Sequence, residues 1–149
     1  MLSKKVIHQS VLGNLNERIQ QLNAALNDAL DATANETKST AGDKHETGRA
    51  MAQLEQEKLS SQISEVIKLK EALSRLDPEI PCTTVCSGAL VETTLGTFYI
   101  SVGIGALNIE GKPIFCMTPM APLCQAMMGK KAGDVINWQG KDVRMVEVA

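Results

Sequence analysis

Two closely spaced carboxylates, Asp43 and Glu46, are the side chains of this chain best suited to chemistry. Both lie in the polar segment 39–51, STAGDKHETGRAM. Carboxylate oxygens are preferred ligands of Mg2+, which is commonly bound by one or two carboxylates and keeps several waters. Two carboxylates in a polar bend would hold such an ion only weakly without ligands from elsewhere. The same spacing also fits a capping box, in which Asp43 caps a following helix and Glu46 bonds back to the backbone.

Three further residues make this segment densely charged: Lys44, His45 and Arg49. A chain reversal needs only a glycine and some polar side chains, so the turn itself does not require this density of charge. The segment is either a solvated charged bend or a surface that meets a charged partner. His45 could titrate near neutral pH, but one histidine beside two acids makes no acid–base system without a substrate.

Apolar residues at helical spacing flank the charged segment on both sides. The first stripe has the 3,4 spacing of a coiled-coil seam and consists of Leu12, Leu15, Ile19, Leu22, Leu26 and Leu30. The second stripe consists of Met51, Leu54, Leu59, Ile63, Val66, Leu69, Leu73 and Leu76. We expect both stripes to be the core of an antiparallel coiled-coil hairpin over residues 1–77, with residues 39–49 as its tip. Pro78 and Pro81 end the second helix and mark a domain boundary.

The hydrophobic period changes from about 3.6 to 2 after this boundary. Residues 87–117 are rich in β-branched and aromatic residues, with turn signals at Gly96 and at residues 110–112. This pattern predicts several antiparallel strands. Trp138 and Phe115 are expected to pack in the core that these strands form.

A short helix is expected next, with Thr118 as N-cap, Pro119 at its first position and Gly129 as C-cap. Two more strands follow around a turn at residues 139–140. Residues 78–149 are therefore expected to form a small antiparallel sheet with one short helix. With the helical hairpin before it, the chain is predicted to be an α+β protein of two modules.

The balance of charge excludes one class of function. The formal net charge is -2, with ten Lys or Arg against eleven Asp or Glu in residues 1–77 and five against six in residues 78–149. Neither half is a basic body that would coat DNA, so we expect any nucleic acid to be handled through a partner. The first ten residues lack the apolar core of a signal peptide, and no apolar run approaches a membrane span. A cytoplasmic protein without membrane contact is expected.

The four cysteines lie in the second half of the chain, at Cys82, Cys86, Cys116 and Cys124. A zinc site usually shows two short paired spacings, and the seven residues between the last two cysteines do not match that pattern. We therefore expect buried reduced thiols, because a free cysteine often behaves as a small hydrophobic residue.

The order of these parts resembles the Gre transcript cleavage factors of bacterial RNA polymerase. In the second module, TPMAPLCQAMMGKKAGDVI is similar to the family signature of Ser-Pro followed by Ala-Leu-x-Gly-Lys-x-x-Gly-Asp. The matching residues are Pro119, Ala126, Met127, Gly129, Lys130, Gly133 and Asp134. At the bend, Gly42, Asp43 and Glu46 match the family's Gly-Asp-x-x-Glu tip, whose two acids carry the activity. The resemblance covers essentially the whole chain and implies an FKBP-like fold for residues 78–149.

The resemblance implies a transcription elongation factor. Such a factor binds RNA polymerase and inserts its coiled-coil tip into the secondary channel to stimulate cleavage of backtracked transcripts. Asp43 and Glu46 would be the catalytic residues, as ligands of a Mg2+ ion held jointly with the polymerase and not tightly bound by this chain alone. Lys44, His45 and Arg49 would be tip contacts. The chain would be no enzyme on its own, because it would stimulate the polymerase's own RNA hydrolysis.

The resemblance also assigns the partner surface. The family's second module docks on the rim of the polymerase channel, so an apolar patch of Phe115, Met117, Pro119 and Met120 is the expected docking surface. Nascent RNA would be reached only through the polymerase, and no direct specific binding to DNA is expected.

Two other functions stay open. Lys44 and His45 separate the two acids where the family usually has Leu-Ser, which favours a polymerase-binding regulator that inhibits or modulates without cleavage. A peptidyl-prolyl isomerase is the more distant alternative, since the family's second module is FKBP-like. That activity needs an apolar pocket lined with several aromatics, whereas Phe98 and Tyr99 are adjacent and so point to opposite faces of a strand.

Overall fold

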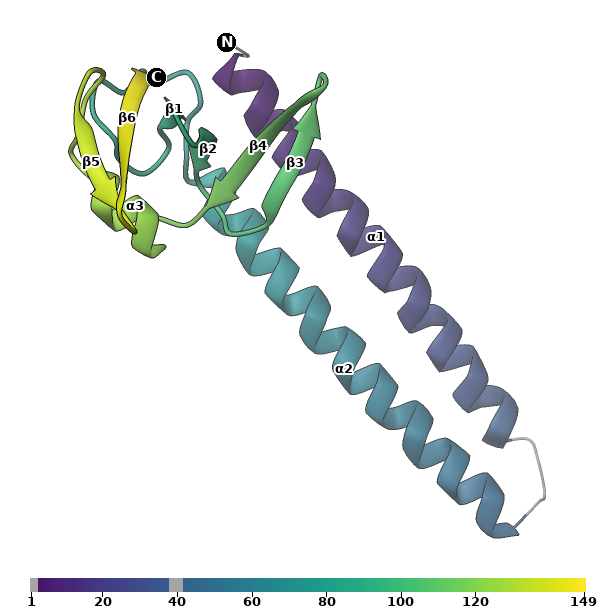
Figure 1. The fold of residues 1–149 in the computed structure, drawn as a ribbon. Helices are drawn as coiled ribbons and strands as arrows, with labels where there is room; N and C mark the ends of the chain where they lie inside the picture. The colour runs from purple at the N-terminus through teal and green to yellow at the C-terminus, as the bar shows by residue number, and fades with distance from the viewer. Residues whose placement is uncertain (1–2, 38–41) are drawn as a thin grey trace. The chain divides into compact units, whose positions relative to one another are not determined.

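The computed structural model describes residues 3–37 and 42–149, without the side chains of residues 33–37 and 42–46. The chain is an α+β protein in which two long helices precede a six-stranded sheet and a short helix (Figure 1). The helices are α1 (Lys4–Thr37), α2 (Gly42–Ser74) and α3 (Pro122–Met127). The strands are β1 (Leu90–Thr93), β2 (Gly96–Ile100), β3 (Gly105–Ile109), β4 (Lys112–Met117), β5 (Val135–Trp138) and β6 (Lys141–Val148).

The chain divides into two compact units. We call the first the sheet unit; it consists of Met1–Leu12 and Glu71–Ala149. The second, the helical unit, is Gly13–Lys70. Each long helix therefore contributes residues to both units, and the sheet unit is assembled from two segments that are distant in sequence.

The sheet has the strand order β3-β4-β2-β1-β6-β5 and is mixed. Four neighbouring pairs are antiparallel, but β2 and β4 are parallel. The prediction of an antiparallel sheet is therefore wrong for this pair. The physical reason is burial: β4 carries the buried residues Ile114 and Cys116, whereas β3 buries only Ile109. The strand of the β3–β4 hairpin with more buried residues, β4, takes the inner position beside β2, and the less buried strand β3 lies at the edge.

The turns predicted between the strands are confirmed. Glu110 and Gln139 both have φ of 51°, and each is followed by a glycine with φ of 80° or 82°. Two successive residues with positive φ are typical of the tight turn that matches the twist of a β-hairpin. Between β1 and β2, the hydroxyl of Thr93 accepts hydrogen bonds from the backbone N–H groups of Leu95 (3.1 Å) and Gly96 (3.2 Å).

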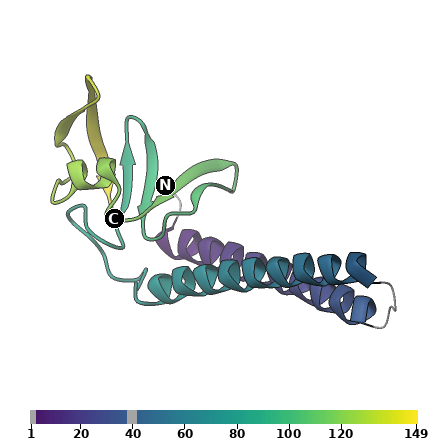
Figure 2. The same cartoon turned by 90° about the horizontal axis from the view of Figure 1, so that it is seen from below.

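The two faces of the sheet pack against different partners. One face carries Phe98, Ile100 and Met145, which form a buried cluster with Cys124 and Met127 of α3. Figure 2 shows α3 beside β5 and β6, and the same arrangement is seen in Figure 1. Trp138 packs against this cluster, as predicted, whereas Phe115 stays partly exposed.

The opposite face of the sheet meets the first turns of α1. Tyr99, the neighbour of Phe98 on β2, is fully buried, and its hydroxyl lies 2.6 Å from Nδ1 of His8. Ile7 and Val11 of α1 are also fully buried. Because side chains alternate across a strand, the adjacent residues Phe98 and Tyr99 point to opposite faces of the sheet, as predicted.

Helix α3 begins later than predicted. Its first residue is Pro122 and the preceding Ala121 makes no side-chain cap, so the prediction of Thr118 as N-cap and Pro119 as first residue is wrong. Thr118 instead closes a separate turn, in which its hydroxyl accepts from the N–H of Met120 at 3.1 Å. Both Pro119 and Pro122 suit the first position of a helix, and the sequence pattern does not decide between them.

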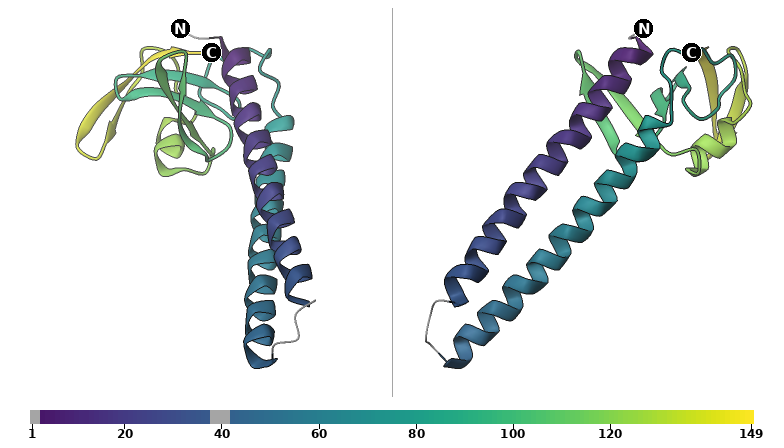
Figure 3. Two further views of the ribbon diagram at one scale, coloured as in Figure 1. Left: turned by 90° about the vertical axis from the view of Figure 1, so that its right-hand side faces the viewer. Right: turned by 180° about the vertical axis from the view of Figure 1, so that it is seen from behind.

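Within the helical unit, α1 and α2 lie side by side in both views of Figure 3. The side-chain amide of Gln56 donates to the carbonyl oxygen of Ala29 at 3.4 Å and joins the two helices. Leu15, Leu59 and Val66 are buried in this unit, as expected.

Three residues of the expected apolar stripes are exposed, so that part of the prediction is wrong. Met51 and Leu54 are 66% and 64% exposed, and Leu30 is also exposed. On α2, the partly buried positions in this region are Ala52 and Gln56 instead. A small residue and a polar residue therefore face inward here, which a count of large apolar residues does not detect.

Candidate functional site

The predicted catalytic acids belong to the first turns of α2. The helix begins at Gly42, so Asp43 and Glu46 are in helical backbone, three residues apart. Positions three apart on a helix are neighbours on its surface. The side chains of Asp43, Lys44, His45 and Glu46 lie outside the described residues, so their roles as metal ligands and tip contacts stay predictions.

The position of this pair at a helix N-terminus has an electrostatic consequence. Unpaired backbone N–H groups give the first turn a partial positive charge, which stabilises ionised carboxylates and opposes a cation bound beside them. Two carboxylates are also too few for the octahedral coordination of Mg2+. The prediction of Asp43 and Glu46 as Mg2+ ligands therefore requires further oxygens from another molecule.

The helix start also bears on the capping-box interpretation. A capping residue precedes the first helical residue, whereas Asp43 follows it. The backbone of Asp43 is therefore helical rather than at the position of an N-cap. Arg49, the predicted tip contact whose side chain is described, lies one turn after Glu46 and is exposed.

The four predicted docking residues are close together in sequence but differ in exposure. Met120 is 79% exposed and Phe115 is partly exposed, whereas Met117 and Pro119 are half-buried. Phe115 packs on Phe98 with ring centroids 5.5 Å apart, which anchors it to the sheet. The accessible apolar surface of this segment is therefore supplied mainly by Met120 and Phe115.

The residues of the family-like signature build a turn of the sheet unit. The C-cap of α3 is Met128, so the prediction of Gly129 as C-cap is wrong by one residue. Gly129 follows with φ of 77°, and its N–H donates to the carbonyl of Val85 at 2.9 Å. Gly133 has φ of 94° and its N–H donates to the carbonyl of Met145 at 2.7 Å. The carboxylate of Asp134 accepts from the N–H of Lys131 at 2.9 Å. These contacts give the signature a structural role, which joins α3 to the sheet.

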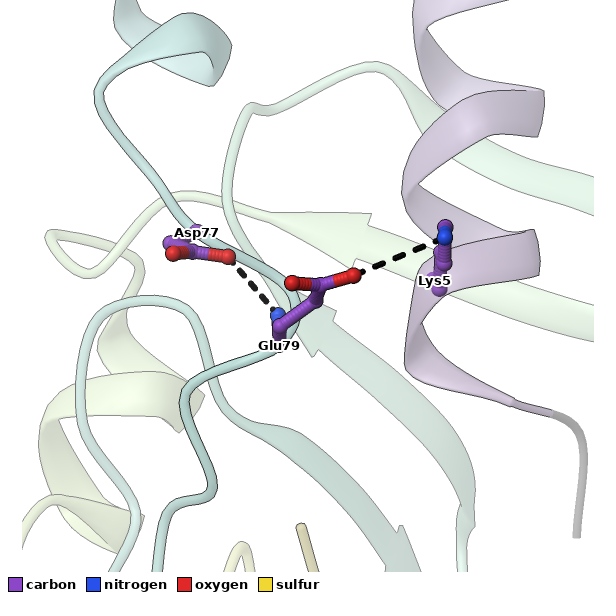
Figure 4. A network of polar contacts seen from close by, with 3 residues as sticks. All are labelled: Lys5, Asp77 and Glu79. Atoms are coloured by element: carbon purple, nitrogen blue, oxygen red, sulfur yellow. Dashed lines mark hydrogen bonds and ion pairs between the residues drawn. The ribbon is translucent and has the colours of Figure 1, made fainter.

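A cluster of polar contacts around the start of α1 was not predicted. Figure 4 shows that Lys5 of α1 points to Glu79, with Nζ 3.5 Å from the carboxylate, and that Asp77 accepts from the N–H of Glu79 at 2.9 Å. Both partners of the ion pair are largely exposed, so it contributes little to stability. The buried neighbour, Lys4, donates from Nζ to the carbonyl of Ile80 at 2.7 Å and lies 3.7 Å from Sγ of Cys82.

A sequence signal for the buried lysine exists. Lys4, Ile7, Val11 and Leu15 follow the spacing of one helix face, and all four are buried. A lysine on the apolar face of a helix indicates an ammonium that is held by specific acceptors. The apolar stripe was instead expected to begin at Leu12.

The cysteines fall into two pairs. Cys116 and Cys124 are buried, as predicted, and burial raises the pKa of Cys116 to about 11 and also raises the pKa of Cys124. Cys82 and Cys86 are only half-buried, and their sulfurs are 3.4 Å apart. The prediction of four buried thiols is therefore wrong for this second pair.

Other classes of site are constrained by the described residues. Among them, no three or more His, Cys, Asp or Glu side chains gather into a possible metal site. Within residues 3–37 and 42–149, the helices are too short or too polar to cross a membrane. The sequence matches no known protein-family model and no curated protein.

Proposed function

We propose that this chain is a transcription elongation factor of the Gre type, which binds bacterial RNA polymerase and stimulates cleavage of backtracked transcripts. One observation carries the proposal: α2 begins at Gly42, which puts both acids of the Gly-Asp-x-x-Glu motif in the first turns of a helix of 33 residues. A long helix can present its terminal residues to a partner as a unit. A carboxylate pair with low metal affinity of its own suits a partner that supplies the remaining ligands.

The finer features of the fold belong to the same proposal. We interpret α1 and α2 as an antiparallel coiled-coil hairpin with its tip at residues 39–49, and residues 78–149 as an FKBP-like module. Leu15 belongs to the first apolar stripe, and Leu59 and Val66 belong to the second. Their burial supports the hairpin. The single helix packed on one face of the mixed sheet supports the second assignment.

Each part of the site has a distinct task in this proposal. Asp43 and Glu46 complete a Mg2+ site together with the polymerase, and the ion supplies Lewis-acid chemistry for RNA hydrolysis. Arg49, together with Lys44 and His45, meets the charged surroundings of the tip. The docking surface, centred on Met120 and Phe115, binds the polymerase through apolar burial.

A transcript-cleavage assay tests the activity. Elongation complexes are stalled and backtracked on purified polymerase from the same source, and the 3′-labelled RNA is followed with and without the protein. We expect short 3′ fragments to be released only when protein, polymerase and Mg2+ are all present. Binding with inhibited synthesis and no cleavage would replace this function with the regulator that the Lys44-His45 pair favours. Absence of binding to polymerase would contradict both the cleavage factor and the regulator.

A matched pair of variants tests the docking surface. Met120 and Val135 are both more than half exposed in the sheet unit, so an aspartate at either position leaves the core intact. We expect Met120→Asp to weaken polymerase binding by roughly tenfold or more, as for the loss of an apolar anchor. Val135→Asp, outside the docking surface, should change the affinity by less than about twofold. Equal losses in both variants would contradict this assignment.

A further inference from the structure

Two thiols and a buried ammonium meet in the sheet unit at a place that the proposed function does not use. The sulfurs of Cys82 and Cys86 are 3.4 Å apart, and the thiol of Cys86 donates to Cys82. Nζ of Lys4 lies 3.7 Å from the Cys82 sulfur. Cys82 therefore accepts two hydrogen bonds, one from a neutral thiol and one from a cation.

The buried ammonium of Lys4 lies against the Cys82 sulfur. Lys4 is only 8% exposed, and the acceptors described for its ammonium are the Ile80 carbonyl and the Cys82 sulfur. The ion pairs of the described residues involve Lys5 and Lys68, and not Lys4. The ammonium of Lys4 is therefore placed to stabilise negative charge that develops on the Cys82 sulfur when this sulfur reacts.

The chain between the two cysteines is held in place. Val85 is 1% exposed, its N–H donates to the carbonyl of Lys130 at 2.8 Å, and its carbonyl accepts from Gly129. The carbonyl of Cys86 accepts from Ala89 at 3.0 Å, which closes a turn. The contact between the sulfurs therefore belongs to a fixed segment, and both cysteines remain half-buried and within reach of small molecules.

We propose that Cys82 and Cys86 are a reversible dithiol–disulfide site that reacts with low-molecular-weight disulfides, with Cys82 as the attacking sulfur and Cys86 as the resolving sulfur. Cys82 loses its proton to solvent, and its thiolate attacks one sulfur of the reagent RSSR, which forms a mixed disulfide and releases RS−. Cys86 then loses its proton to solvent and its sulfur attacks Cys82, which expels the second RS−. The two thiolates take up the two protons, so one dithiol and RSSR give one protein disulfide and two RSH.

The order of attack follows from the contacts. Burial and the hydrogen bond to Cys82 raise the pKa of Cys86, which keeps it protonated while Cys82 reacts. The thiolate is the nucleophile in thiol–disulfide exchange, and a nearby lysine promotes it. Cys116 and Cys124 serve as internal controls, since both are buried.

The test uses the full-length protein, oxidised glutathione as the reagent and peptide mass spectrometry as the readout. We expect a Cys82–Cys86 disulfide that is reversed by reduced glutathione, while Cys116 and Cys124 stay reduced. In Cys86→Ser, glutathione should remain attached to Cys82. In Cys82→Ser, attachment to Cys86 should be at least about tenfold slower. Failure to form the disulfide, or equal rates in the two variants, would overturn the proposal.

Substitutions of Lys4 and of its neighbour Lys5 test whether the Lys4 ammonium promotes the reaction of Cys82. Lys4→Met should slow the attack of Cys82 on oxidised glutathione by roughly tenfold, whereas Lys5→Met, at the exposed neighbour, should leave the rate unchanged. Circular dichroism shows whether each variant is folded. Equal rates in both folded variants would overturn the assignment of Lys4, and the contrast between the two cysteine variants tests the site even where Lys4→Met does not fold.

Discussion

The sheet unit and the helical unit are stabilised in different ways. In the sheet unit, both faces of the sheet are covered, and residues such as Ile100, Met145 and Val143 are fully buried. In the helical unit, Leu15, Leu59 and Val66 are the buried hydrophobic residues among the described side chains, and large apolar residues such as Met51 and Leu54 face solvent. The candidate catalytic acids belong to the unit with the smaller core.

This difference indicates how stability is distributed. Burial of apolar area supplies most of the favourable free energy of folding, so a unit with few buried side chains opens at lower cost than one with a continuous core. We therefore expect the helical unit to determine activity and the sheet unit to determine global stability. Substitutions in the two units separate these effects.

The largest effect is expected from the two acids of the helical unit. Replacing Asp43 by Asn and Glu46 by Gln keeps their size and removes the charge that would hold Mg2+, so cleavage stimulation should fall by roughly 100-fold or more. Polymerase binding should change little. Full cleavage by the double variant would leave the acids with a local structural role, since Asn remains compatible with the first turn of a helix.

Truncation of a core residue should separate the units by stability. Ile100→Ala removes a fully buried side chain of the sheet unit and should lower the free energy of unfolding by about 3 kcal/mol. Leu54→Ala, in the helical unit, should change it by less than about 0.5 kcal/mol because Leu54 is exposed. Urea titrations followed by far-UV circular dichroism measure both variants, and the fluorescence of Trp138, the single tryptophan, reports on the sheet unit alone. Similar losses in the two variants would show that the helical unit is as tightly packed as the sheet unit.

Replacing glycine by alanine should lower the stability at one position and raise it at another. Gly129 has φ of 77°, so Gly129→Ala should destabilise the sheet unit by about 1 kcal/mol. Gly13 is in the interior of α1 with open space around its Cβ position, so Gly13→Ala should stabilise the helical unit by about 0.5–1 kcal/mol. Thermal unfolding followed by circular dichroism at 222 nm measures both changes. Destabilisation by Gly13→Ala would contradict the open space around the Cβ position of Gly13.

The smallest effect is a pH dependence confined to the sheet unit. Burial lowers the pKa of His8, an effect that Asp77 partly opposes, so the unfolded chain takes up the proton at a higher pH than the folded one. Stability should therefore fall as the pH drops from above 7 through about 6.5 and below, toward the folded pKa. His8→Gln should remove this slope, and His45→Gln should not. Urea titrations between pH 5.5 and 8, at roughly half-unit steps, distinguish the two; an equal slope in both variants would contradict the assignment to His8.

Local features of the fold could be predicted from the sequence, and features that depend on distant strands could not. Gly111, Gly140 and Gly129 have positive φ where turn and cap chemistry place them. The parallel pairing of β2 with β4 depends on which strand of a hairpin is more apolar as a whole, and no local signal reports it. The inward position of Gln56 on α2 also depends on its partner helix.

In the candidate site too, local features could be predicted from the sequence and contacts between distant residues could not. The motif of Asp43 and Glu46 could be recognised in the sequence because its residues are three apart, and the helix start at Gly42 agrees with that spacing. The contact of Lys4 with Cys82 was missed because its partners are 78 positions apart. The short spacing of Cys82 and Cys86 fits no zinc motif, and no local sequence pattern indicates the direct contact of their sulfurs.

The two-segment composition of the sheet unit has a consequence for the chain during its synthesis. His8 and Tyr99 are 91 positions apart, and ribosomes add about 5–20 residues per second. Ile7 and Val11 therefore leave the ribosome roughly 5–20 seconds before β2 exists to cover them. During this interval the apolar face on the first turns of α1 stays uncovered, so the sheet unit can complete its core only after its strands have been synthesised.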